Sequence, residues 1–251
     1  MRIKSSLVLF ISISFMIILN ACGSSEFVKE LSLRDRFNLA VKQYQEGSYD
    51  KSIENLRVIS YDRGSGFADS VQYILAECYF MREQYLIASA EYRDLIRFNT
   101  NSSLVPSARF KVALALSKIS PKFDLDQNYT NKAIIEFQNF IEYYPTNEKV
   151  REAEKNITEL RNKLAYKDYE TASLYRINEH YRSALVYYQG ILEKYHDSEY
   201  ADLADFGVIE IYILQNKYAL ARTEIDKFLQ KYINSSKIDK VTKLKKEIEN
   251  K

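Results

Sequence analysis

Small and large apolar residues recur along the chain at fixed distances after a tyrosine that follows a short polar break. The tyrosine occurs at Tyr49, Tyr85, Tyr181 and Tyr218. A small residue stands three positions after each tyrosine, and large apolar residues stand seven and ten positions after it. Residues three or four apart share one face of an α-helix. The pattern therefore predicts an amphipathic helix that begins at each tyrosine.

A second set of positions precedes each break, with an alanine nine residues before three of the tyrosines, at Ala40, Ala76 and Ala172. A further partial copy has Ala133, followed by two phenylalanines at the same spacing and a late proline. Two short amphipathic helices cannot bury their apolar faces alone, but stacked pairs form a continuous core. The sequence predicts an all-α protein, a superhelical stack of about five tetratricopeptide-like helix pairs.

The copies are not evenly spaced. The third contains an insertion near 117–128, which includes Pro121, and is followed by a long helical segment at about 148–177. The tail places apolar residues at helical spacing among lysines, which is typical of a capping helix with a polar outer face. We therefore expect a repeat domain at 32–233 and a C-terminal capping helix at 234–251.

The first 21 residues are predicted to be a cleaved signal peptide. Arg2 and Lys4 precede an apolar stretch of about 13 residues, which is short for a membrane-spanning helix. The segment from Leu19 to Ser24 resembles the lipobox of bacterial lipoproteins, with a small residue before Cys22. The resemblance implies that Cys22 carries the lipid, and that residues 22–31 are a lipidated tether. Two or more acyl chains anchor a protein stably.

Composition and charge exclude several function classes. The chain has 36 Lys and Arg against 34 Asp and Glu, and the two bases of the leader account for the excess. No basic patch for nucleic acid is evident. We identify no phosphate-binding loop, metal-ligand cluster or nucleophile motif, and therefore expect no catalytic site, no metal, no cofactor and no enzymatic activity. Cys78 lies in an apolar helix and is expected to be a buried thiol.

An aromatic residue stands three positions before the upstream small position in every copy, and residues four and seven positions later share its helical face. These side chains could form a groove for an extended apolar peptide, or they could pack between adjacent repeats. The predicted groove residues are Phe37, Val41, Tyr44, Tyr73, Glu77, Phe80 and Phe110. The corresponding rings of the last two copies, Tyr169 and Phe206, are expected to contribute less.

Two segments carry a family resemblance. One runs from Asp126 to Ala133, with Tyr144 and Pro145 downstream, and the other runs from Leu164 to Ala172. Both resemble the BamD family, the tetratricopeptide lipoproteins of the outer-membrane β-barrel assembly machine. The resemblance covers about residues 5–233, although His196 stands where the family usually has proline.

The resemblance implies a lipid-anchored scaffold on the periplasmic face of the outer membrane, which assists folding and insertion of β-barrel proteins. Implied partners are the periplasmic domains of a BamA-like barrel-forming protein, unfolded β-barrel substrates and other assembly lipoproteins. An alternative is a tetratricopeptide lipoprotein adaptor that recruits cell-wall hydrolases or proteases. Carbohydrate capture is disfavoured because the chain has no Trp for stacking on sugars.

Overall fold

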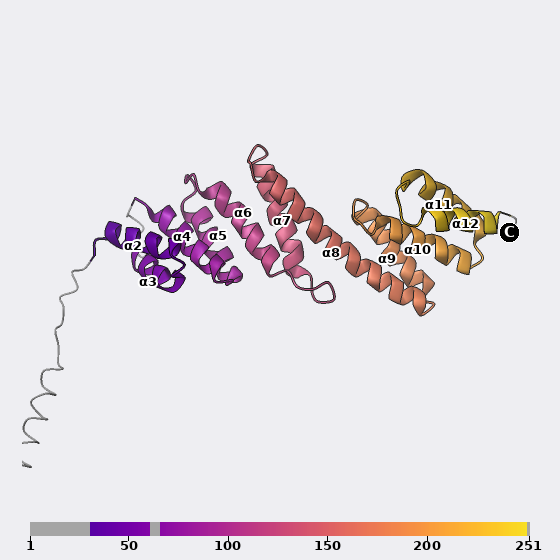
Figure 1. Cartoon of the computed structure of the whole chain (residues 1–251), viewed down its shortest axis with the longest axis horizontal. Coiled ribbons are helices and arrows are strands. Elements are labelled where there is room, and N and C mark those ends of the chain that lie inside the picture. Colours follow the sequence, from indigo (N-terminus) through magenta and orange to yellow (C-terminus); the bar gives the residue numbers. More distant parts are fainter. Residues whose placement is uncertain (1–30, 61–65, 250–251) are drawn as a thin grey trace, which may run out of the picture.

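The computed structural model describes residues 31–60 and 66–249, and every regular element in these ranges is an α-helix. The predicted signal peptide and Cys22 lie outside the described residues. The helices, labelled in Figure 1, are α2 (Leu33–Gln45), α3 (Tyr49–Ser60), α4 (Ala68–Met81), α5 (Tyr85–Phe98), α6 (Val105–Lys118), α7 (Asn128–Tyr143), α8 (Val150–Ile177), α9 (Tyr181–Lys194), α10 (Ala201–Leu214), α11 (Tyr218–Lys231) and α12 (Ile238–Ile248).

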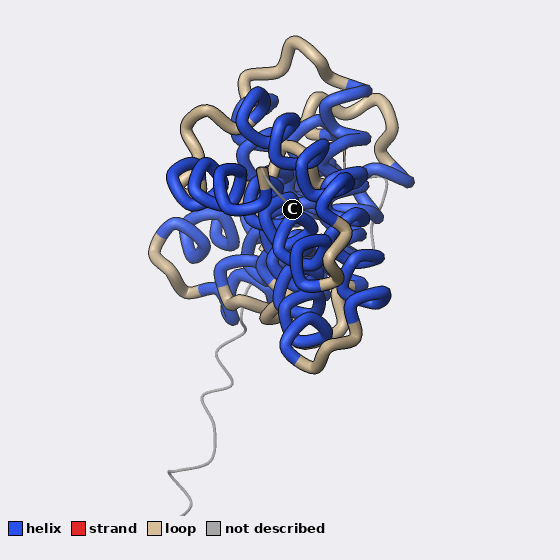
Figure 2. The backbone as a smooth tube through the Cα atoms, turned by 90° about the vertical axis from the view of Figure 1, so that its right-hand side faces the viewer, coloured by secondary structure: helices blue, strands red, loops and turns tan. Residues whose placement is uncertain are grey.

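The described helices form five pairs stacked along the long axis of the molecule (Figure 1). The pairs are α2/α3, α4/α5, α6/α7, α8/α9 and α10/α11, and helices adjacent in the chain pack against each other. Helix α12 closes the stack by burying Val241 and Ile248 against the last pair. Figure 2, which looks along the stack, shows the connecting loops at its periphery. The predicted superhelical stack is confirmed.

The predicted register is also confirmed. Tyr49, Tyr85, Tyr181 and Tyr218 are the first residues of α3, α5, α9 and α11. The small residues three positions into these helices, and their counterpart in α7, are completely buried, so the paired helices approach closely there. These residues are Ser52, Ala88, Ala133, Ala184 and Ala221.

The break between the two helices of a pair is built in the same way four times. Its central residue has a left-handed backbone at Gly47, Glu83, Glu179 and Asn216, with φ between 55° and 76°. The N–H of this residue bonds the carbonyl three residues earlier, and the next N–H bonds the carbonyl five residues earlier. These bonds form a Schellman motif, which satisfies carbonyls that the end of the first helix leaves free.

Four of the turns that precede a helix also share one hydrogen-bond pattern. A side chain in each turn accepts a hydrogen bond from the backbone N–H two residues later. The accepting residues are Ser102, Asn147, Ser198 and Ser235. The carbonyl of each accepts the N–H three residues later, which belongs to the first residue of α6, α8, α10 or α12. Ser and Asn favour such local bonds to the backbone. The periodicity of apolar residues gave no indication of these positions.

Glycine is required where α10 approaches α9. A Cβ at Gly207 would lie 2.5 Å from the ring of Tyr188, which is itself buried. We expect Gly207→Ala to lower the free energy of unfolding by about 1–3 kcal/mol, because the ring must move within a packed core.

Gly190→Ala is the matched control, since a Cβ there meets no atom within 4 Å. The control should stabilise α9 by about 0.5–1 kcal/mol. Urea unfolding of both variants measures the difference, and equal effects would contradict this account.

Helix α8 joins two parts of the core. It has 28 residues and is the longest of the described helices. Its N-terminal half contributes Leu160 and Leu164 to the cluster formed with α2–α7, whereas Ala165 and Ala172 belong to the cluster formed with α9 and α10. The long helical segment predicted at about 148–177 is thus present, and it links the third pair to the fourth.

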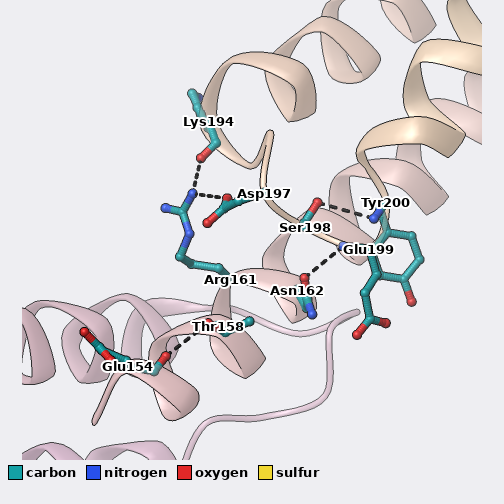
Figure 3. A network of polar contacts seen from close by, with 9 residues as sticks. All are labelled: Glu154, Thr158, Arg161, Asn162, Lys194, Asp197, Ser198, Glu199 and Tyr200. Carbon is teal, nitrogen blue, oxygen red and sulfur yellow. Dashed lines mark hydrogen bonds and ion pairs between the residues drawn. The ribbon is translucent and has the colours of Figure 1, made fainter. Parts of the chain in front are cut away.

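Polar contacts hold the loop between α9 and α10 against α8 (Figure 3). The guanidinium of Arg161 donates to the carbonyl of Lys194 and to the carboxylate of Asp197, both at 2.7 Å. The side-chain oxygen of Asn162 accepts the N–H of Glu199 at 3.1 Å. The hydrogen bond from Arg161 lowers the pKa of Asp197. These contacts fix the loop between the fourth and fifth pairs on the long helix.

Candidate protein-binding surface

Side chains from three other helices converge on the buried carboxylate of Glu77 in α4. Lys111 of α6 lies 2.8 Å from one carboxylate oxygen and 3.0 Å from the other. The hydroxyl of Tyr44 in α2 donates to Glu77 at 3.3 Å, and the hydroxyl of Tyr92 in α5 also donates to it. A buried carboxylate needs such partners, because desolvation without them costs several kcal/mol.

The tyrosine hydroxyls around this carboxylate remain protonated. Burial, followed by the negative charge of Glu77, raises the pKa of Tyr44 to about 12. The same two causes raise the pKa of Tyr92 and of Tyr73 well above the usual range for tyrosine. Tyr73 packs edge-on against Tyr92, with ring centroids 5.7 Å apart. The rings therefore present neutral hydrogen-bond donors to the carboxylate.

Phe80 extends this group along the same face of α4. The ammonium of Lys111 lies 4.8 Å from the centre of the Phe80 ring, a cation–π contact, and the ring packs against Tyr85 at 5.1 Å. We call the following residues the Glu77 cluster: Tyr44, Tyr73, Glu77, Phe80, Tyr92 and Lys111. Four of these were predicted groove residues, and they come from α2 and α4 in the first two pairs. The third pair adds Lys111.

Phe37 and Val41 lie on the same face of α2 as Tyr44, and both are half-buried. The ring of Phe37 packs on that of Phe67, with centroids 5.1 Å apart. The guanidinium of Arg34 lies 4.4 Å from the centre of the Phe67 ring. These residues extend the surface toward the N-terminal end of the stack without joining the contacts around Glu77.

Phe110 does not line a groove. It is only 3% exposed, and its ring packs edge-on against Phe137 and Phe140 at 5.7 Å and 5.4 Å. Both partners belong to α7, the second helix of the same pair. The interpretation of this ring as a groove residue was wrong, because its helix turns it into the core of the third pair.

The corresponding rings of the last two pairs also pack within the fold. Phe206 is buried, with the ammonium of Lys240 at 4.6 Å from its centre. Tyr169 is half-buried and packs against Tyr188 and Tyr200 at 5.9 Å and 5.8 Å. The aromatic series therefore does not form one continuous groove along the described stack.

Two members of the Glu77 cluster were not predicted. Tyr92 was assigned to packing, which is correct for its ring but omits its hydroxyl. Lys111 lies in α6 directly between Phe110 and Val112, which are both buried. This position is the signal that could have identified it, because a lysine among buried neighbours requires an acidic partner.

Aromatic, hydroxyl and charged side chains of the described residues gather around Glu77. The described residues contain no group of three or more His, Cys, Asp or Glu side chains placed to hold a metal ion. Among the same residues, no helix combines the length and the apolar character needed to cross a bilayer. The stack of helix pairs defines the molecule as a helical-repeat protein.

The family model described as "Outer membrane lipoprotein" (YfiO) matches residues 30–212. The chain belongs to this family of outer membrane lipoproteins. No curated protein matches the chain. Among solved structures, it is similar to the TPR2AB domain of yeast Sti1, described in its complex with pHSP90, at 13% identity and a TM-score of 0.39, covering 87% of this chain and 98% of that one. It is also similar to a thermophilic TPR protein of Thermus thermophilus, at 12% identity and a TM-score of 0.38, covering 81% and 93%.

Proposed function

We propose that this protein is an outer-membrane lipoprotein scaffold that assists folding and insertion of β-barrel outer-membrane proteins. In this role it binds the periplasmic domains of a barrel-forming assembly protein and receives unfolded barrel substrates. Membership of the outer membrane lipoprotein family and the repeat fold support the general role. The observation that carries the proposal for substrates is the Glu77 cluster, where three consecutive pairs present aromatic and polar groups together.

The chemistry of the Glu77 cluster suits an extended strand. An unfolded barrel strand alternates apolar and polar side chains and has unpaired backbone groups. The half-buried rings of Tyr44, Tyr73 and Phe80 offer apolar contacts. Lys111, a quarter exposed at its side chain, can donate to a backbone or terminal carboxylate oxygen. Rings usually supply much of the energy at such interfaces.

Truncating a ring of this surface should weaken substrate binding. We expect Tyr44→Ala and Phe80→Ala to reduce the affinity for a peptide with alternating apolar residues and a C-terminal aromatic by about tenfold or more. Fluorescence anisotropy with a labelled peptide measures the affinity. Circular dichroism shows whether each variant is folded.

Ile213→Ala is the matched control. Ile213 stands five residues before Tyr218, as Phe80 stands five before Tyr85, and it is also half-buried. It should leave peptide affinity within twofold of the wild type, a difference of about 0.4 kcal/mol. If the N-terminal variants unfold, the rings are structural; if they fold and bind normally, substrate contacts lie elsewhere.

We further propose that Cys22, outside the described residues, carries the lipid anchor, that the leader is residues 1–21 and that the tether is residues 22–31. Full-length protein extracted from outer membranes should then have an acylated Cys22 at its N-terminus, detected by mass spectrometry. The same preparation should contain a barrel-forming protein. An unmodified Cys22 would contradict the anchor, and co-purification of cell-wall hydrolases or proteases instead would favour the adaptor function.

A further inference from the structure

Helix α8, the first helix of the fourth pair, is less covered than α4 and α10, the first helices of the second and fifth pairs. The position compared lies seven residues before the tyrosine that begins the second helix of each pair. It is Cys78 in α4 and Ile211 in α10, and both are completely buried. The corresponding residue of α8 is Leu174, which is 61% exposed. A large apolar residue at a position that is otherwise buried indicates that a covering element is missing.

The covering element in the other pairs is the second helix of the preceding pair. The thiol of Cys78 lies 3.3 Å from the hydroxyl of Ser52 in α3. In the fifth pair, Tyr188 of α9 sits directly on Gly207 of α10. The residue of α8 that corresponds to Gly207 is Glu170, and it is exposed. Both positions show that a helix normally occupies this place.

The length of α8 explains the difference. Its N-terminal half packs in the cluster with α7, and its C-terminal half runs on past α7 toward α9 and α10 (Figure 1). The C-terminal half therefore has no preceding second helix beside it. We define the open face of α8 as the residues of this half that share one helical side: Tyr166, Glu170, Leu174 and Ile177.

The size of the open face matches one short helix. It runs from Tyr166 to Ile177, a length of about 17 Å at 1.5 Å per residue. Helix α3, which covers α4 in the equivalent place, has 12 residues. Ile177 is 71% exposed, so both apolar residues at the C-terminal end of the open face are accessible.

A hollow of about 410 Å³ adjoins the N-terminal end of the open face. Its aromatic walls are Phe123, from the loop before α7, Tyr166, and Tyr200, from the loop before α10. The ring of Tyr166 lies 4.5 Å from that of Phe123 and 5.1 Å from that of Tyr200. Two loops from neighbouring pairs and α8 thus border an open hollow where one large apolar side chain can pack.

The charges around this surface favour a basic ligand. Burial, the neighbouring Tyr166 and the carboxylates of Glu199 and Glu170 raise the pKa of Tyr200, so both carboxylates lie near that ring. Within the described structure, neither carboxylate has an ion-pair partner. The ammonium groups of Lys163 and Lys167 are turned to the loop before α7.

Hydrogen bonds hold the ammonium groups of these two lysines against the loop before α7. Lys163 donates to the Ser120 hydroxyl at 2.8 Å and to the Pro121 carbonyl at 3.2 Å. Lys167 donates to the Leu125 carbonyl at 2.7 Å. Lys122 and Lys163 line the hollow on the side of Phe123, whereas Glu199 lines it next to Tyr200.

We propose that the open face of α8 and the adjoining hollow bind a basic amphipathic helix of a partner protein, which takes the place that a second helix occupies in the other pairs. The apolar stripe of the ligand packs on Leu174 and Ile177, a large apolar residue enters the hollow, and Lys or Arg side chains face Glu170 and Glu199. This surface is separate from the Glu77 cluster, and the inference goes beyond the proposed function because the ligand is a folded helix and not an unfolded barrel strand.

The test uses constrained helical peptides of about 14 residues, close to four helical turns. A basic peptide has one apolar stripe flanked by Lys and Arg, and an acidic peptide has the same stripe flanked by Glu. A third peptide has the composition of the basic peptide but no stripe. Full-length protein in detergent should bind the basic amphipathic peptide saturably, with the acidic peptide weaker and the difference smaller at high salt. Leu174→Asp and Ile177→Asp should each weaken binding about tenfold or more. Both residues are exposed, so thermal unfolding should be unchanged.

Val186→Asp is the control, because Val186 is 64% exposed on α9, outside the open face. It should bind like the wild type. Equal binding to wild type and Leu174→Asp, or equal binding of the peptide without a stripe, would overturn the proposal. Tyr44→Ala should retain helix binding while losing strand-peptide binding, so failure here is distinguishable from failure of the proposed function.

Discussion

Replacing Lys111 with Met is expected to destabilise the protein by about 3 kcal/mol, because it leaves the carboxylate of Glu77 buried without its cation. The side chain of Glu77 is 9% exposed, and that of Lys111 is 25% exposed. The hydroxyls of Tyr44 and Tyr92 continue to donate to the carboxylate, but they carry no charge. Urea unfolding at pH 7, followed by circular dichroism, measures the loss.

The comparison with an exposed ion pair separates burial from charge. Arg93 of α5 and Glu136 of α7 also join two helices at 2.7 Å, with side chains 48% and 28% exposed. We expect Arg93→Met to cost less than about 1 kcal/mol, since water already screens that pair. If both variants lose the same stability, burial of Glu77 has no energetic consequence and our description of the cluster is wrong.

A double variant tests the cause further. In Glu77→Gln with Lys111→Met, the neutral amide can still accept from Tyr92, and no charge remains buried. The double variant should therefore be more stable than Lys111→Met alone by about 1–2 kcal/mol. Additive losses from the two single changes would show that the two side chains do not interact.

The fold followed from local periodicity because the repeat imposes the same contacts in every pair. Ala88 and Ala184 are buried for the same reason at the same register, so a spacing read from one copy holds in the next. The binding surface did not follow in the same way. Glu77 and Lys111 are 34 residues apart, and no helical spacing relates them. Only the packing of α4 against its neighbours brings that pair together.

The environment of single residues also depends on neighbouring helices. Phe110 has the spacing of the groove aromatics, but α7 provides two phenylalanines that enclose it. Leu174 has the same apolar character as the buried Ile211, and its exposure depends on the extra length of α8. Sequence periodicity indicates which residues share a face of a helix, whereas the presence of a covering helix is a property of the whole stack.

The last pair contains an acidic contact that should make stability depend on pH. Asp205 in α10 and Glu224 in α11 occupy the places that Gln72 and Glu91 occupy in the second pair, where the amide donates to the carboxylate. Asp205 is 4% exposed, and one of its carboxylate oxygens has no hydrogen-bond partner in the described structure. Burial, and next the charge of Glu224, raise the pKa of Asp205 to about 7.

The surroundings of Asp205 include charges of both signs. Lys231 and Lys227 of α11 lower its pKa, and Asp202 of α10 raises it, but burial and Glu224 dominate. Because the folded pKa lies above the usual value of 3.8, the folded state binds more protons than the unfolded state between about pH 4 and pH 7. Stability is therefore greatest at the acidic end of this range and is lost as the pH rises through about 7.

We expect the wild type to lose about 2–3 kcal/mol of stability between about pH 5 and pH 8 through this group, from the shift in pKa and about 1.36 kcal/mol per unit. Asp205→Asn removes the titrating group and supplies a donor for Glu224, so it should flatten this dependence and be the more stable protein at pH 8. Gln72→Asp is the converse variant, because it creates the same acidic contact in the second pair and should add a loss of stability at pH 8. Urea unfolding of the three proteins at both pH values measures these differences. Two results would show that ionisation of Asp205 does not destabilise the folded state. One is a wild type whose stability is constant from pH 5 to pH 8, and the other is an Asp205→Asn protein whose stability changes with pH as much as that of the wild type.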